Sequence, residues 1–126
     1  MTPEEAAVSR ETVKARARLY QFRKWADANP AAIAWMYAHS RDLARECKHS
    51  SPSGLFTDLR EKSGIHLNGD RTPKLANHHS PLVVRILIKS MPECAHVYRT
   101  KPSCYDLLDE ADLPTFDHHG KLRWPL

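Results

Sequence analysis

Residues 77–101, NHHSPLVVRILIKSMPECAHVYRTK, constrain the fold more than any other stretch because they hold the densest apolar run of the chain between two prolines. Ser80 is a favourable helix N-cap, and Pro81 is a favourable first helical residue. Pro92 cannot continue a helix, so it ends the element about three turns later. The sequence therefore predicts a helix over residues 81–91.

Within this element only Arg85, Lys89 and Ser90 are polar, and the two basic residues lie four positions apart on one helix edge. The pattern predicts a mostly buried helix with a narrow basic stripe. The run LVVRILI over residues 82–88 is also rich in β-branched residues and is compatible with a buried strand. The Ser-Pro start favours the helix, and the strand stays open as the alternative.

The composition is that of a small globular domain. The chain has 126 residues, of which 41% are hydrophobic and 27% charged, with a net charge of +4. No apolar run approaches the roughly 18 residues that a membrane span needs, and the acidic, helical start is unlike a signal peptide. We expect a cytoplasmic protein with no membrane partner.

Residues 1–28 are predicted to form one long helix, either packed on the rest of the domain or extending from it. Residue spacing places one apolar stripe along it, formed by Val8, Ala15, Leu19, Phe22 and Ala26. Much of the remaining surface is basic, contributed by Arg10, Lys14, Arg16, Arg18, Arg23 and Lys24. This surface is either an ordinary solvated face or a basic arm that lies along phosphate or pairs with a partner's acids.

Residues 29–102 are predicted to form a helical core. Asn29 and Pro30 start a second helix over residues 31–47, and a third follows Pro52 and ends at Gly64. Alternating residues at 65–67 and 95–100 predict two short strands that pair, and Asn68-Gly69 predicts a tight turn. The expected fold is mainly α: a small helical domain with one short two-stranded sheet, winged-helix-like in layout.

Residues 103–126 are predicted to form an acidic and then irregular C-terminal tail. Ser103 is placed to cap a short acidic turn, and the remainder is expected to be poorly ordered. Residues 71–101 are strongly basic, whereas residues 105–117 carry five acids and no base. This polarity along the chain predicts one basic surface and one acidic surface.

No catalytic motif is present, so we expect neither enzymatic activity nor a cofactor. Cys47, Cys94 and Cys104 have no CxxC spacing and are expected to be free thiols. Two metal sites stay open as alternatives, although neither matches a known spacing. One would use Cys94, His96 and Cys104 for zinc, and the other would use Asn77, Asp117, His118 and His119 in a small metal-dependent enzyme.

The start of the predicted helix over residues 81–91 suggests a function. A helix N-terminus presents free N–H groups and a positive dipole end, which bind phosphate. We predict a nucleic-acid site, for DNA in the first instance, that contacts the backbone with little base reading. Its expected residues are Lys74, His78, His79, Ser80, Arg85, Lys89, Arg99 and Lys101.

The apolar character of the same helix supports a second hypothesis. A recognition helix normally exposes a broad polar face, and residues 82–88 do not. The chain is then a protein-interaction module that binds and modulates a host or phage protein, and a homodimer stays open. The expected partner-binding residues are Leu82, Trp35 and Trp124.

Three segments together resemble a group of small phage and prophage proteins. They are WADANPAAIAWMYAHSRDLARE, GLFTDLREKSGI and NHHSPLVVRILIKSMPECAHVYRTK, which cover about residues 25–101. The group is similar in layout to winged helix-turn-helix domains, so the resemblance implies such a fold. This chain departs from the group by placing LVVRILI where the others carry a polar, arginine-bearing helix, which weakens any carry-over of DNA binding to this helix.

Overall fold

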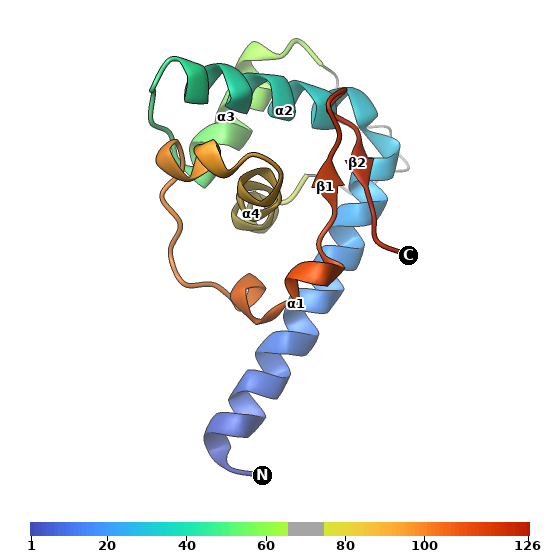
Figure 1. The fold of residues 1–126 in the computed structure, drawn as a ribbon. Helices are drawn as coiled ribbons and strands as arrows, with labels where there is room; N and C mark the ends of the chain where they lie inside the picture. Colours follow the sequence, from blue (N-terminus) through green and yellow to red (C-terminus); the bar gives the residue numbers. More distant parts are fainter. Residues whose placement is uncertain (66–74) are drawn as a thin grey trace.

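The computed structural model of this protein describes residues 1–65 and 75–126 and is mainly helical, with one small antiparallel sheet (Figure 1). This confirms the coarse fold class. The helices are α1 (Pro3–Ala28), α2 (Pro30–Arg45), α3 (Pro52–Lys62) and α4 (Ser80–Ser90). Short 3-10 helices are η1 (Asn77–His79), η2 (Pro92–His96), η3 (Cys104–Leu107) and η4 (Glu110–Asp112), and the strands are β1 (Thr115–Phe116) and β2 (Leu122–Arg123).

Helix α4 is the centre of the molecule, and Figure 1 views it nearly end-on with the other elements around it. It contacts α3, β1, η1 and η2. Its side chains Leu82, Val83, Val84, Ile86 and Leu87 are all fully buried. Since these five positions cover most of the helix circumference, α4 is a core helix, and the prediction of a helix here is confirmed.

The helix boundaries follow local capping chemistry. The Thr2 side chain accepts a hydrogen bond from the Glu5 N–H at 3.1 Å, and the Ser51 side chain accepts one from the Gly54 N–H at 3.0 Å. Gly64 follows α3 with a φ of 69°, a conformation that glycine adopts without strain. Asn29 precedes α2 but does not cap it, because its side-chain amide donates to the Trp25 carbonyl instead.

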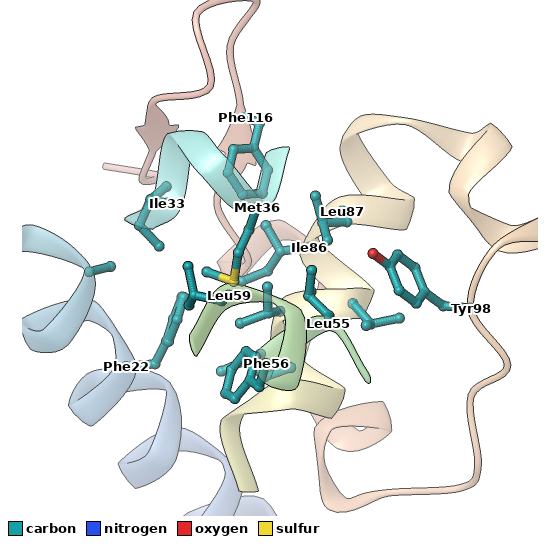
Figure 2. Close-up of a cluster of buried hydrophobic side chains, with 14 of the residues drawn as sticks. Phe22, Ile33, Met36, Leu55, Phe56, Leu59, Ile86, Leu87, Tyr98 and Phe116 are labelled. Atoms are coloured by element: carbon teal, nitrogen blue, oxygen red, sulfur yellow. The ribbon is translucent and has the colours of Figure 1, made fainter. Parts of the chain in front are cut away.

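The core joins segments from the whole chain (Figure 2). Phe22 of α1, Met36 of α2 and Phe56 of α3 are each no more than 1% exposed, and Figure 2 shows them converging on α4. A single polar bridge crosses this apolar region among the described residues. The Ser40 and Tyr98 hydroxyls lie 2.7 Å apart, so each satisfies the other's buried oxygen.

The predicted location of the sheet is wrong. Residues 92–96 form η2 rather than a strand, and Tyr98 makes only one parallel bridge, to Ser50. The expected partner strand at residues 65–67 and the Asn68-Gly69 turn extend into residues 66–74, outside the described part of the chain. Pro92 lies in the first turn of this element, which suits a tight 3-10 turn rather than an extended strand.

The two-stranded sheet lies instead in the segment that was expected to be an irregular tail. Thr115 pairs with Arg123 and Phe116 with Leu122, joined by a turn in which Asp117 Oδ1 accepts the N–H groups of His119 and Lys121. The hairpin is held against α4 because Phe116 packs on the core and its N–H donates to the Ser90 hydroxyl.

The turn of this hairpin also lies directly on α2. Gly120 has a φ of 76°, and a Cβ at this position would come within 3.1 Å of Tyr37 Cδ1 and 3.2 Å of Ala34 Cα. The close approach therefore requires glycine on two grounds, its backbone conformation and its lack of a side chain. It fixes the hairpin against the start of α2.

Helix α1 extends well beyond the body it packs against (Figure 1). At 26 residues it spans about 39 Å, and Figure 1 shows its N-terminal half projecting from the rest of the molecule. Its buried residues begin only at Ala15 and continue with Phe22, Trp25 and Ala26. Among residues 1–65 and 75–126, no helix combines the length and apolarity that a membrane-spanning segment needs.

Candidate functional site

The basic edge of α4 is engaged inside the molecule. Arg85 donates from Nε to Asp106 Oδ1, from Nη1 to the Pro81 carbonyl and from Nη2 to the Lys101 carbonyl, each at 2.8 Å. Its side chain is only 12% exposed. Since all three guanidinium nitrogens have acceptors, Arg85 binds the segment that follows the core rather than presenting a charge to solvent.

Lys89 has the same role one turn along α4. Its ammonium donates to the carbonyl oxygens of Glu110 and Leu113, the latter at 2.8 Å. The acidic segment 105–113 is therefore held against the basic edge of α4, and the two regions of opposite charge meet each other here. The expected division into one free basic and one free acidic surface does not hold at α4.

The start of α4 is closed in a similar way. Its first residues follow directly from η1, and the Ser80 hydroxyl donates to the Asn77 carbonyl instead of capping the helix, as was expected of it. His79 is 3% exposed, and neither of its ring nitrogens has a hydrogen-bond partner among residues 1–65 and 75–126. Burial lowers the pKa of His79 to about 4, so the ring is neutral near pH 7.

The remaining predicted contacts on this side are scattered. Arg99 and Lys101 are exposed on the extended segment after η2. His78 is exposed beside α1, and its pKa is lowered first by partial burial and then by the nearby charges of Arg18 and Lys14. Lys74 lies outside the described residues. Of the predicted contacts, the structure leaves His78, Arg99 and Lys101 exposed.

The outward face of α1 is a different case. Between residues 10 and 24 it carries six basic side chains, and Glu11 is the only acid. Arg18 is half-buried, and the other five are exposed, namely Arg10, Lys14, Arg16, Arg23 and Lys24. The one ion pair within this stretch is a loose Lys14–Glu11 contact of 3.8 Å between exposed side chains. Surface pairs of this kind contribute little, so this charge stays available.

Two basic rows on α1 border an exposed apolar strip. Arg10 and Lys14 lie on one side of it, and Arg16 and Arg23, seven residues apart, lie on the other. The strip itself contains Val13, which is 64% exposed, and Tyr20, which is 60% exposed. The Lys24 ammonium lies over the Tyr20 ring, 4.6 Å from its centroid. We call this surface, from Arg10 to Lys24, the α1 face.

The three residues expected to bind a partner occupy different environments. Leu82 is fully buried in the core, so it is not part of an exposed apolar surface. Trp35 is half-buried and stacks on His39, with 4.5 Å between ring centroids. Trp124 is half-buried, lies 6.5 Å from the Phe22 ring, and carries the Arg23 guanidinium 4.8 Å above its own ring.

The candidate metal ligands do not form a metal site among the described residues, and Asp117 is engaged in other contacts. Asp117 uses one oxygen for the hairpin turn, and its other oxygen accepts from Arg123 Nε at 3.0 Å. Cys47, Cys94 and Cys104 are free thiols, with Cys94 buried. In the part of the chain that the structure describes, no three His, Cys, Asp or Glu side chains gather as a metal site would require.

A polar hollow of about 550 Å³ lies between α2 and α3. In it His39 Nε2 lies 3.0 Å from Asp58 Oδ2, and Lys62 Nζ lies 3.2 Å from the other oxygen of the same carboxylate. This pairing satisfies Asp58 and holds the two helices together. These three side chains therefore have a structural role.

Comparison of the chain with protein-family models, with curated proteins and with solved structures found no match.

Proposed function

We propose that this protein binds nucleic acid, DNA in the first instance, through phosphate contacts made by the α1 face. The observation that carries the proposal is the excess of five exposed basic side chains over one acid between residues 10 and 24, on a helix that projects from the body. Within residues 1–65 and 75–126 these five side chains donate to no internal carbonyl, unlike Arg85 and Lys89. A phosphate backbone is bound chiefly by such exposed cations.

The shape of α1 also supports this function. An α-helix with its side chains is about 10–12 Å across, and the major groove of B-DNA is about 12 Å wide. The two basic rows of the α1 face diverge to either side of the helix, so both could reach phosphates bordering a groove. His78, beside Arg18, would extend this contact toward η1.

The winged-helix mode of binding stays a separate prediction. It would require α4 to act as a recognition helix, and the burial of Leu82, Val83 and Ile86 argues against that use. Binding through the α1 face does not require α4 to be exposed. The class of function is the one expected from the sequence, but the contact surface is α1 instead of α4.

The test compares two triple variants with the same loss of charge. One is Arg10→Gln/Lys14→Gln/Arg16→Gln on the α1 face, and the control is Arg45→Gln/Lys62→Gln/Lys101→Gln elsewhere on the surface. Fluorescence anisotropy with labelled random duplex DNA is measured at about 50 mM and about 200 mM salt, a range over which phosphate-driven binding falls by orders of magnitude.

We expect the α1 variant to bind more weakly and with a shallower salt dependence, by up to about one unit of slope per lost contact. The control should bind nearly as well as the parent protein. Equal losses in both variants would indicate a response to net charge alone, and unchanged binding by the α1 variant would exclude this surface.

The exposed strip on α1 favours a second function, that of a protein-interaction module. Val13 and Tyr20 are seven residues apart on one face and are bordered by basic residues, which suits an acidic amphipathic helix. Val13→Ser/Tyr20→Ser should then abolish capture of a partner while leaving DNA affinity nearly unchanged. Loss of DNA binding in this variant would instead assign the strip to nucleic acid.

A further inference from the structure

A cavity of about 420 Å³ lies where the end of α1, the start of α2 and the β1–β2 turn meet. Its walls include the apolar side chains of Ile33, Ala34 and Leu122 and the ring of Trp124. This volume lies within the range of about 300–1,000 Å³ typical of small-ligand sites. The close packing of Gly120 on Ala34 and Tyr37 fixes the hairpin, so the cavity is preformed.

The mouth of the cavity carries charges of both signs. His119 and Lys121 border it from the hairpin, and both are exposed. Asp27, from the last turn of α1, borders it as well. A ligand that suits this lining has a flat apolar ring, an anionic group for Lys121 and His119, and an amino group that can donate to the Asp27 carboxylate. A nucleotide whose base is adenine, cytosine or guanine combines these three features.

The cavity is continuous with the α1 face. Arg23 belongs to that face, and its guanidinium lies 4.8 Å from the centroid of the Trp124 ring, which in turn lines the cavity. A backbone that follows the basic rows of α1 toward its C-terminal end therefore reaches the cavity mouth. A base inside a duplex cannot enter such a site, whereas the base of a single strand can.

We propose that this cavity binds one nucleotide, with its base inserted beside Trp124 and its phosphate held by Lys121 and His119. The nucleotide is a unit of a single strand whose neighbouring phosphates lie on the α1 face, and in this form the inference rests on the proposed function. A free mononucleotide shares the same chemistry and is the other source that the experiment distinguishes.

The test uses Trp124→Leu and Trp124→Phe as a matched pair. Leucine keeps apolar contact with Phe22 but removes the aromatic ring, and phenylalanine keeps both. Binding of a labelled 15-nucleotide oligo(dC), whose bases carry the amino group, and of a labelled duplex is measured by anisotropy for each variant, with thermal melting as the check of folding. Lys121→Glu tests whether the positive charge at the cavity mouth contributes to binding. Lys101→Glu, away from the cavity, is its control.

Stacking of a base on an aromatic side chain is typically worth about a factor of ten or more in affinity. We expect Trp124→Leu to weaken binding of the single strand by about tenfold, with duplex affinity changed less than about twofold. Trp124→Phe should restore most of the loss. Lys121→Glu should weaken single-strand binding more than Lys101→Glu does. Equal effects on single strand and duplex, or none on the single strand, would overturn the proposal.

A second measurement separates this proposal from the proposed function. Adenosine and cytidine monophosphates are titrated into the parent protein while the indole N–H resonances are followed by NMR, with Trp124→Phe identifying the Trp124 signal. A saturable shift of that signal with no binding of any oligonucleotide would retain the cavity as a mononucleotide site and reject the proposed function. No shift and no preference for single strands would reject the cavity as a nucleotide site.

Discussion

Arg85 Nε donates to Asp106 Oδ1 at 2.8 Å and so joins the basic edge of α4 to the acidic segment that follows the core. The two oppositely charged segments therefore meet in the folded protein. The arginine holds η3 against α4, and the Ser103 N–H donates to the other oxygen of the same carboxylate. The arginine, followed by the Ser103 N–H, keeps the pKa of Asp106 below its ordinary value, so this carboxyl is ionised near pH 7.

Replacing Arg85 with Met should therefore destabilise the fold. Three hydrogen bonds from a largely buried guanidinium are lost, and we expect the free energy of unfolding in urea to fall by about 1–3 kcal/mol. Arg99→Met, at an exposed position, is the control and should change it by less than about 0.5 kcal/mol. DNA affinity of the folded Arg85→Met protein should equal that of the parent, and a large specific loss would restore Arg85 as a phosphate ligand.

Leu82→Ala should cost about 2–5 kcal/mol of unfolding free energy, since Leu82 is fully buried in α4 and the packed core cannot fill the cavity. Chemical denaturation measures this cost. Val13→Ala on the exposed strip of α1 is the comparison and should be nearly neutral. An unfolding free energy for Leu82→Ala equal to that of the parent would contradict the buried position.

The Ser40–Tyr98 bridge should show a measurable coupling. Both hydroxyls are buried and only 2.7 Å apart, so removing one leaves the other without a partner. Ser40→Ala and Tyr98→Phe should each cost about 1–2 kcal/mol, and the double variant should cost less than their sum. A double-mutant cycle built from urea denaturation tests this, and strict additivity would show that the two hydroxyls do not interact.

His79 should make stability depend on pH between about 4 and 6.5. Burial lowers its pKa to about 4 in the folded protein, whereas an unfolded histidine titrates near 6.5. The unfolded state therefore takes up the proton first as the pH falls, and stability is full above about 6.5 and is lost through this window. We expect a loss of about 2 kcal/mol between pH 7 and pH 5.

The matching variant is His79→Phe, which keeps an aromatic ring beside Phe22 and cannot be protonated. Its unfolding free energy should fall much less than that of the parent across this pH window, with a smaller slope left by His78, whose pKa is also lowered. His118→Ala, at an exposed position, should retain the dependence of the parent. The same slope in His79→Phe and in the parent would assign the pH response to other groups.

The helices were predictable because their signals are local. Pro3, Pro30, Pro52 and Pro81 each lie in the first turn of a helix, and the caps at Thr2 and Ser51 form as their residue types indicate. The capped turn at Ser103 was also predicted, and the structure has both of its hydrogen bonds. Such features need only neighbouring residues, so they can be read without knowledge of the fold.

The hairpin was missed although its signal was present. Asp117 and Gly120 bracket a short turn between two alternating segments, a combination typical of hairpins with longer loops. His118 and His119 instead favoured the interpretation of this segment as a metal site. The segment at residues 95–100 was misassigned for a related reason, because alternation over a few residues does not distinguish a strand from a 3-10 turn.

The engagement of Arg85 and Lys89 could not be predicted from their spacing. Their acceptors are mostly backbone carbonyls 16 to 24 residues further along the chain. Every residue has a backbone carbonyl, so the type of a residue does not reveal that its carbonyl will accept such a bond. The charge of the α1 face was visible in the sequence, but its exposure follows from how far α1 extends beyond the body. Tertiary contacts decide which charges remain free.

The burial of α4 by segments from both ends of the chain has a consequence for how the protein is made. Its neighbours include η1 and η2, which are close in sequence, but also β1, whose Phe116 lies near the C-terminal end. During synthesis α1, α2 and α3 emerge first, and the core around α4 stays open until residues 113–124 have left the ribosome. We therefore expect the domain to complete its fold late, in one cooperative step, with its central helix as the last apolar surface to be covered.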